Sequence, residues 1–456
     1  MSEFSPIPPV VPEPPPIQPA PHQRNIGAWL FLAMISVGLI SMAIWSVYAK
    51  KAGEPSYSAL EPQLKIALMQ EALPSGGFGQ KPISETLKPV KEEAEKGVAK
   101  STHAARVLLV AQQASGEKPS QKALETLSKS REPEDQNFAR IYTTDKLTPA
   151  EAKTFSPEPK LYSERLAEAQ AYEKAGDPSK LKKLLSLEEY TPVILSISVI
   201  FLLFMLGIGA LVGLVVYSRS AKWPFREITK PGVPEGDRLA VRAALALCAY
   251  IAAQIVALIF VVMELHIAAN IAMMASWFGM VVGILAFRTP NHEADPWTKI
   301  MGRKKPLSHL IPLGATGFLA NIPILAGAIL ITVALSKLFP SPTHPISEDL
   351  ANGTPMVLLS SFLLACIAAP IVEETVFRGI LLRAFLSIFK SPWAAILLQA
   401  FIFAAIHPQG PAGIPPLMAV GAMCGWVTYR SGSLIPAMIL HFVHNTATLL
   451  FAISMM

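Results

Sequence analysis

The chain has 456 residues, of which 52% are apolar and 16% charged, and its formal net charge is +6. The apolar residues form long runs, which is typical of a polytopic membrane protein. Many Lys and Arg residues flank these runs, where they set topology, so the positive charge does not indicate nucleic-acid binding. The three cysteines all lie inside apolar runs, which excludes a disulfide framework in the polar region and a cysteine metal cluster.

The N-terminal segment, residues 1–25, is rich in proline and predicts a disordered or polyproline tail. The apolar run 26–49 follows, with Trp29 near one end and Trp45 and Tyr48 near the other, as an aromatic belt would place them. A cleaved signal peptide is the alternative. The long proline-rich segment and the absence of a clear A-x-A site favour an uncleaved transmembrane anchor.

Residues 50–190 form a polar insert rich in Ala, Glu, Lys and Leu. Stretches 104–113 and 163–172 space their apolar residues three and four apart, which predicts amphipathic helices. Segment 174–178 reads as a helix stop followed by a turn. No clean repeat period is present, so we predict a small helical extramembrane domain that could recruit a protein partner.

Further apolar runs continue almost to the C-terminus. Residues 191–309 predict additional transmembrane helices, and residues 310–456 a separate C-terminal domain. With the anchor they suggest about nine spans in an all-α polytopic membrane protein. The candidate spans after the insert are 191–217, 239–263, 267–287, 310–337, 355–377, 392–407, 413–429 and 433–455.

The basic clusters between the spans all fall on one side of the membrane if this topology holds. They occur after 217, after 287, around 378–390 and at Arg430. The positive-inside rule therefore places the N-terminal tail in the cytoplasm and both the insert and the C-terminus outside. We expect a multi-pass integral membrane protein, and a bacterial plasma membrane fits the architecture.

Two adjacent acids, Glu373 and Glu374, lie near the end of an apolar run. An ionised group inside a membrane span costs about 2.5–3.5 kcal/mol on insertion scales, so such acids indicate function. Glu374 and Arg378 stand four apart and can pair on one helix face. Glu373 points about 100° away from Glu374, so the two acids need not share a role. The alternative is an ion pair at a helix end, at the cytoplasmic boundary.

Three more polar residues follow in later apolar runs: His407, and His441 with Asn445, which share one helix face at a spacing of four. Glu373 and His407 lie about 17 residues on either side of Lys390. At a rise of about 1.5 Å per residue each is about 25 Å along its helix, so an antiparallel hairpin would hold them level.

These residue types suit hydrolysis of an amide by an activated water. A buried glutamate can act as general base, and a facing His and Asn can donate hydrogen bonds to a developing oxyanion. Glu373, His407 and His441 could instead be three ligands of a hydrolytic zinc ion. Residue types alone leave both mechanisms open.

Taken in order, Glu373-Glu-x-x-x-Arg378, Phe403-x-x-x-His407 and His441-x-x-x-Asn445 resemble the motif set of the CAAX prenyl protease and bacteriocin-processing (CPBP, Abi) family. The resemblance covers roughly residues 310 to 455. It implies a CAAX-protease-like helical bundle and an intramembrane endopeptidase that cleaves a peptide or lipidated protein substrate among membrane lipids.

By the same resemblance, Glu373 is the base, His407 helps to activate the water, and His441 and Asn445 stabilise the oxyanion. Glu374 and Arg378 would be supporting residues. This assignment needs no cofactor, with zinc as the alternative. The competing functions are a non-proteolytic membrane scaffold or immunity protein, and a proton-coupled transporter, which the absence of an internal repeat disfavours.

Overall fold

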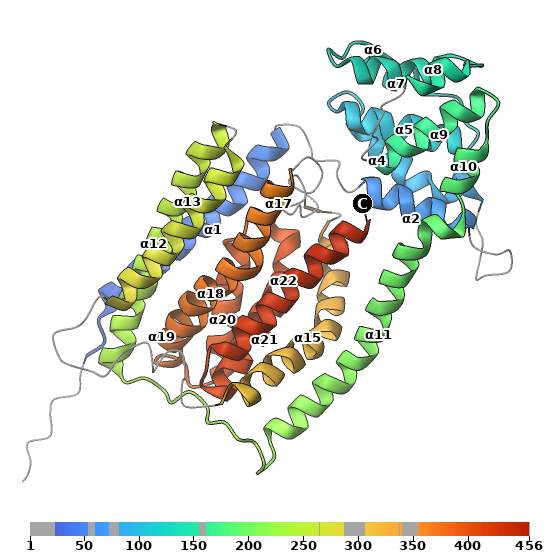
Figure 1. The fold of residues 1–456 in the computed structure, drawn as a ribbon. Coiled ribbons are helices and arrows are strands. Elements are labelled where there is room, and N and C mark those ends of the chain that lie inside the picture. The colour runs from blue at the N-terminus through green and yellow to red at the C-terminus, as the bar shows by residue number, and fades with distance from the viewer. Residues whose placement is uncertain are drawn as a thin grey trace, which may run out of the picture.

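The computed structural model describes residues 23–52, 60–72, 82–154, 161–263, 265–286, 306–336, 338–339 and 354–455. Every regular element within these ranges is a helix. Figure 1 shows two parts: an apolar helical bundle, and a cluster of shorter helices at one end of it. The predicted all-α membrane fold is therefore confirmed.

The bundle consists of long apolar helices and several shorter helical segments joined end to end. These elements are α1 (Ile26–Ala52), α11 (Leu187–Ser218), α12 (Val233–Val262), α13 (His266–Ala286), α15 (Leu307–Leu335), α17 (Pro355–Phe362), η1 (Leu363–Ala368), α18 (Ala369–Glu373), η2 (Glu374–Leu381), α19 (Leu382–Leu386), α20 (Pro392–Ala405), η3 (Pro411–Gly413), α21 (Ile414–Ser431) and α22 (Ile435–Met455). Large apolar side chains cover their outer surfaces, as contact with lipid requires.

Seven helices among the described residues are long and apolar enough to cross a membrane. These include the run from Pro355 to Leu386, which α17, η1, α18, η2 and α19 form without a break. The two shortest predicted spans, 392–407 and 413–429, appear as α20 and α21, which are not among the seven. The predicted count of nine is thus not confirmed.

The first helix packs into the bundle. Asp237, in the first turns of α12, accepts hydrogen bonds from the Asn25 backbone N–H and the Trp29 indole N–H, both at 2.7 Å. Arg24 donates to the Ser387 carbonyl oxygen at 2.9 Å. This network ties the start of α1 to α12 and α19, as the predicted membrane anchor would need. Most of the tail 1–25 lies outside the described residues.

The insert is a helical cluster with its own core. Its helices are α2 (Leu60–Ala72), α3 (Ile83–Thr86), α4 (Lys88–Gly97), α5 (Thr102–Ala114), α6 (Gln121–Ser128), α7 (Pro133–Thr143), α8 (Pro149–Lys153), α9 (Tyr162–Lys174) and α10 (Ser179–Leu184). The stretches 104–113 and 163–172 lie within α5 and α9, so both predicted helices are present. Leu108, Leu109 and Leu166 pack in one buried core.

The insert and the basic segment 219–232 lie at opposite ends of α11 (Figure 1). At the basic end, α21 stops at Gly432, whose φ is 68°. A side chain there would bring Cβ to 2.8 Å from the Arg226 carbonyl oxygen. Glycine is therefore required both by the left-handed turn and by the close passage of the basic segment.

Candidate active site

The two glutamates lie where the helix 355–386 changes its winding. Residues Leu363–Ala368 and Glu374–Leu381 are π-helical, with an α-helical turn between them that ends at Glu373. Such wider turns are rare and occur mostly as short bulges, frequently at functional sites. The rewinding begins at Glu374, so it sets the directions in which the two acids point.

Glu374 is the centre of a buried polar cluster. One of its oxygens, Oε1, accepts a hydrogen bond from Arg378 Nη1 at 2.9 Å and another from His441 Nδ1 at 2.8 Å. The side chains of Glu374 and Arg378 are both 0% exposed. The predicted pair four residues apart is therefore present, and it extends to α22 through His441, which the spacing did not indicate.

Arg378 is held from its other side by α21. Its Nη2 donates to the Gly421 carbonyl oxygen at 3.2 Å, and Gln399 Nε2 of α20 donates to the same oxygen at 3.0 Å. A Cβ on Gly421 would lie 3.1 Å from that of Ala400, so α20 and α21 approach closely here. The sequence prediction missed Gln399 and Gly421. A lone glutamine in an apolar helix was the signal that could have revealed the first.

Glu373 faces the same histidine from the opposite side. Its Oε2 lies 3.9 Å from His441 Nε2, so the two acids approach the two nitrogens of one ring. Glu373 is 8% exposed and His441 4%. No hydrogen bond joins the Glu373 carboxylate to another described residue. It is the accessible acid of the pair, while Glu374 is enclosed.

His407 lies just beyond the end of α20. Its Nδ1 is 2.6 Å from the Phe403 carbonyl oxygen. Because a carbonyl only accepts, Nδ1 carries the proton, and in a neutral ring Nε2 then has a free lone pair. The rings of His407 and His441 both contact the ring of Phe403, and His441 also faces Glu373. This arrangement agrees with the prediction that Glu373 and His407 lie at a similar level.

Phe403 packs among the polar groups. Its ring centroid is 4.7 Å from that of His407 and 6.0 Å from that of His441, and the Arg378 guanidinium lies 4.5 Å from its centre. A cation over an aromatic face is favourable when both are removed from water. Phe403 thus contacts both histidine rings and covers the buried arginine.

Asn445 and His441 both contact the helix 355–386, but they do so at different levels. Its Nδ2 donates to the Ala365 carbonyl oxygen, in the first π-helical segment, at 2.7 Å. The two α22 residues therefore share one face, as predicted. The side-chain hydrogen bond of Asn445 goes to η1 and not to Glu373 or His441. Its second amide hydrogen can still donate to another acceptor.

The predicted alternative of a zinc site fits this arrangement poorly. Zinc ligands lie about 2.0–2.3 Å from the metal, so three of them must converge closely. Among the residues that the structure describes, no three His, Cys, Asp or Glu side chains gather in this way. Glu373 and His441 approach each other, and the Nε2 lone pair of His407 stays available because its Nδ1 donates to a backbone carbonyl. We derive no step through a metal ion.

Comparison with known proteins matched the part of the chain that contains this site. The model of the type II CAAX prenyl endopeptidase Rce1-like family matches residues 355–447. An uncharacterized 24.3 kDa protein of Escherichia coli is 33% identical over 153 residues, which cover 31% of this chain and 70% of that protein. No solved structure matches.

These matches and the apolar helices define an integral membrane protein of a protease family. The chain belongs to the CAAX prenyl protease and bacteriocin-processing family, as the motifs predicted. Every predicted site residue falls within the matched range 355–447. Membership identifies a peptidase at the level of the family; the α1, insert and α11–α13 regions lie outside that range.

Proposed function

We propose that this protein is an intramembrane endopeptidase in which Glu373 activates the attacking water. One observation carries the proposal. Glu374 accepts hydrogen bonds from Arg378 and His441 through Oε1, whereas Glu373 has no hydrogen-bonded partner among the described residues and faces His441 Nε2 at 3.9 Å. Two carboxylates thus approach the His441 ring: Glu374, which is hydrogen-bonded to it, and Glu373, which has no hydrogen bond to a described residue.

The difference between the acids follows from their partners. Glu374 accepts hydrogen bonds from a guanidinium and an imidazole, and it would orient His441. Glu373 is nearly as buried but lacks such donors, so its carboxylate is the one that can take a proton from a bound water.

The histidines would complete the reaction. His407 Nε2 can accept a hydrogen bond from the water, while Glu373 removes its proton as the water oxygen bonds to the scissile carbonyl carbon. Because His441 Nδ1 donates to Glu374, its Nε2 can donate to the oxyanion only when the ring is an imidazolium. Asn445 would give its second amide hydrogen. When the carbon–nitrogen bond breaks, the proton on Glu373 passes to the leaving amine.

The substrate we propose is a peptide segment at the membrane, either part of a membrane protein or a lipidated, CAAX-like chain. Supporting this, the acids are enclosed within a lipid-facing bundle and not in a water-filled domain. We place the protein in a bacterial plasma membrane with the insert on the outer side, where it could present substrates or bind a partner.

Glu373→Gln tests the proposal, with Glu188→Gln as the matched control. Glu188 is an exposed glutamate in the first turn of α11. Loss of a general base lowers the turnover number by about 10²–10⁴-fold. We would map new N-termini in membranes that contain each variant, and then assay a peptide that spans a mapped cleavage site with purified protein.

We expect the wild type and Glu188→Gln to produce the same new termini and Glu373→Gln to produce none. Cleavage by Glu373→Gln at the wild-type rate would remove Glu373 as base. If Glu373→Gln also corrects every defect of a deletion strain, the protein acts as a scaffold and not as a protease.

A further inference from the structure

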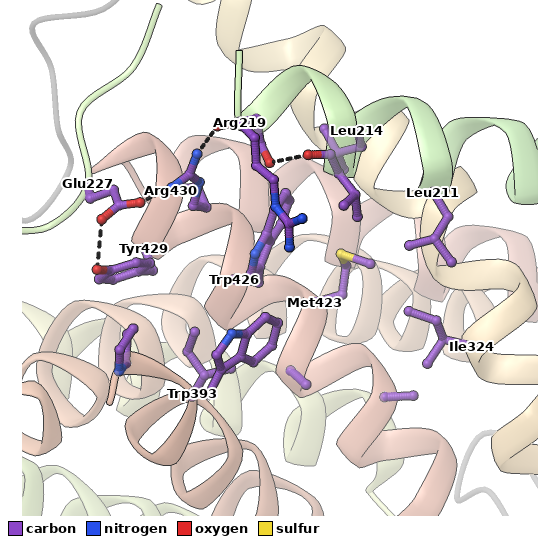
Figure 2. A pocket seen from close by; sticks show the side chains of 16 residues that line it. Leu211, Leu214, Arg219, Glu227, Ile324, Trp393, Met423, Trp426, Tyr429 and Arg430 are labelled. Carbon is purple, nitrogen blue, oxygen red and sulfur yellow. Dashed lines mark hydrogen bonds and ion pairs between the residues drawn. The ribbon is translucent and has the colours of Figure 1, made fainter. Parts of the chain in front are cut away.

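A cavity of about 380 Å³ lies apart from the candidate active site. It is formed between α11, α15, α20 and α21, towards the end of the bundle where the basic segment runs. None of the predicted catalytic residues lines it. Its volume lies within the range of about 300–1,000 Å³ that is usual for small-molecule sites. Figure 2 shows its side chains from close by.

One end of the cavity is positively charged. Arg430 is bound to Glu227 and to the Ser218 carbonyl oxygen, and Tyr429 also donates to Glu227, at 2.8 Å. Arg219, at the end of α11, turns its guanidinium into the cavity (Figure 2). This guanidinium has no hydrogen bond or ion pair with any other described residue. The cavity lining therefore holds two guanidinium groups and one carboxylate, that of Glu227, which leaves a net positive charge.

The other end is apolar. Leu211 and Leu214 of α11, Ile324 of α15 and Met423 of α21 line it. Ile324 is 40% exposed, so this end opens to the outer surface of the bundle, where lipid chains run. The cavity thus has a positively charged end and an apolar end, which follow one another along the direction of the membrane helices.

Two tryptophans lie between these ends. Trp393, from the first turn of α20, is 54% exposed, and Trp426 of α21 is partly buried (Figure 2). Tryptophan concentrates at the level of lipid headgroups, where its ring is half in hydrocarbon and its N–H reaches polar groups. Their position marks the boundary between the charged and the apolar parts of the cavity.

We propose that this cavity binds an anionic phospholipid, with the phosphate at Arg219 and the start of an acyl chain against the apolar end. A soluble anion would use the guanidinium but leave the apolar surface exposed. A zwitterionic lipid would bring a second positive charge towards the two arginines. An anionic headgroup satisfies both ends, and Arg is the side chain best suited to phosphate.

A lipid in this position would contact the pair of helices that holds Arg378. Ile396 and Met423 line the cavity, while Gln399 and Gly421, three and two residues away on the same helices, hold Arg378 from within. The cavity and the acid cluster therefore lie on different faces of the α20–α21 pair.

The experiment measures tryptophan quenching in vesicles of phosphatidylcholine. Brominated phosphatidylglycerol or brominated phosphatidylcholine is added at the same mole fraction, because bromine on an acyl chain quenches only tryptophans that it contacts. Arg219→Gln is compared with Arg226→Gln. Arg226 is an exposed arginine of the same segment that does not line the cavity. Trp426→Phe identifies the part of the signal that comes from the cavity.

For the wild type we expect about a fivefold preference for phosphatidylglycerol, the effect of one interfacial arginine on an anionic lipid. Arg219→Gln should reduce it to about one, Trp426→Phe should lower the part of the quenching that is specific to phosphatidylglycerol, and Arg226→Gln should change the preference by less than about twofold. Equal quenching by both lipids in the wild type would overturn the proposal. So would equal losses in the two arginine variants, since they would indicate general surface attraction. The readout is independent of proteolysis.

Discussion

The insert and the bundle both bury charged groups between helices, but they treat them differently. In the insert, Arg106 donates to Asp135 at 2.7 Å and to Glu164 at 2.8 Å, and Ser130 donates to the remaining oxygen of Asp135 at 2.6 Å. Each acid oxygen of Asp135 is used, and the arginine reaches the surface at 14% exposure. In the insert, these charged side chains join α5, α7 and α9, and both carboxylate oxygens of Asp135 accept hydrogen bonds.

In the bundle, the cluster around Arg378 is fully enclosed and incompletely satisfied. Glu374 Oε2, Arg378 Nε and Gln399 Oε1 are buried without a hydrogen-bond partner among the described residues. Unpaired buried polar atoms are costly, and structures that keep them usually do so at functional sites. The contrast indicates that ion pairs stabilise the insert. The bundle is less stable than it could be, because it holds charged groups in buried positions where some polar atoms lack partners.

Removing one arginine from each region tests that contrast most strongly. Arg378→Met leaves the buried charge of Glu374 without its guanidinium partner, for which we expect a loss of about 3–5 kcal/mol of stability. Arg106→Met should cost about 1–3 kcal/mol, because Asp135 keeps its hydrogen bond from Ser130 and water can reach Glu164. Thermal unfolding in detergent micelles would compare them. Because Glu374→Gln removes the stranded charge, it should restore part of the loss in Arg378→Met; equal losses in the two arginine variants would contradict the contrast.

Close packing around the site gives the next largest effect. At Gly314 of α15, an added Cβ would lie 2.6 Å from the Pro436 carbonyl oxygen and 2.7 Å from Ile439 Cβ. Gly314→Ala should therefore push α22 away, at about 1–3 kcal/mol of stability. Since α22 carries His441, a shift of about 1 Å could lower the rate by about 10²-fold.

Gly327→Ala is the control on the same helix, because a Cβ there meets nothing within 4 Å. It should be neutral or slightly stabilising, as alanine favours the helix. If the two alanine variants have the same melting temperature and rate, the close contact between α15 and α22 is wrong.

A smaller, pH-dependent effect is expected in the insert. Glu61 accepts hydrogen bonds from the Ser163 N–H, at 2.8 Å, and from its hydroxyl. Burial raises the pKa of Glu61 above its ordinary value of 4.5, although His103 and Ser163 oppose the shift. A raised pKa in the folded state means that this contribution to stability is present below 4.5 and is lost as the pH rises through the folded value.

Glu61→Gln removes this titration. The difference in stability between the wild type and Glu61→Gln should therefore decrease as the pH rises from about 4 towards neutral. Hydrogen exchange at the Ser163 amide, compared between the two proteins at each pH, would measure it. A difference that grows with pH would show that the hydrogen bonds outweigh burial.

The smallest expected effect is that of metal removal. If Glu373 acts on free water, a chelator should leave the cleavage rate within about twofold. Metal analysis of active protein is the accompanying measurement. A stoichiometric zinc, together with activity that a chelator abolishes and zinc restores, would establish the alternative in which Glu373, His407 and His441 are ligands.

Parts of the site were predictable because they depend on local spacing. A separation of four residues brings Glu374 to Arg378 wherever the chain is helical, and a fixed rise per residue puts Glu373 and His407 at a similar level. The same reasoning did not reveal that His441 bridges both acids, because the rotation of α22 against the helix 355–386 is set by packing. Glycines such as Gly314 and Gly421 decide that packing, and their effect is visible only when the opposing helix is known.

The sequence by itself determined the apolar helices, the polar insert, the family motifs and the set of candidate site residues. Each of these follows from composition or from spacing along one helix. The tertiary structure decided that Glu374, and not Glu373, accepts hydrogen bonds from Arg378 and His441. It also decided that the Gly421 carbonyl accepts a hydrogen bond from Arg378 and that Arg219 points into a separate cavity. These depend on distances between helices, and such distances result from side-chain packing summed over the whole bundle. No local pattern in the chain encodes them.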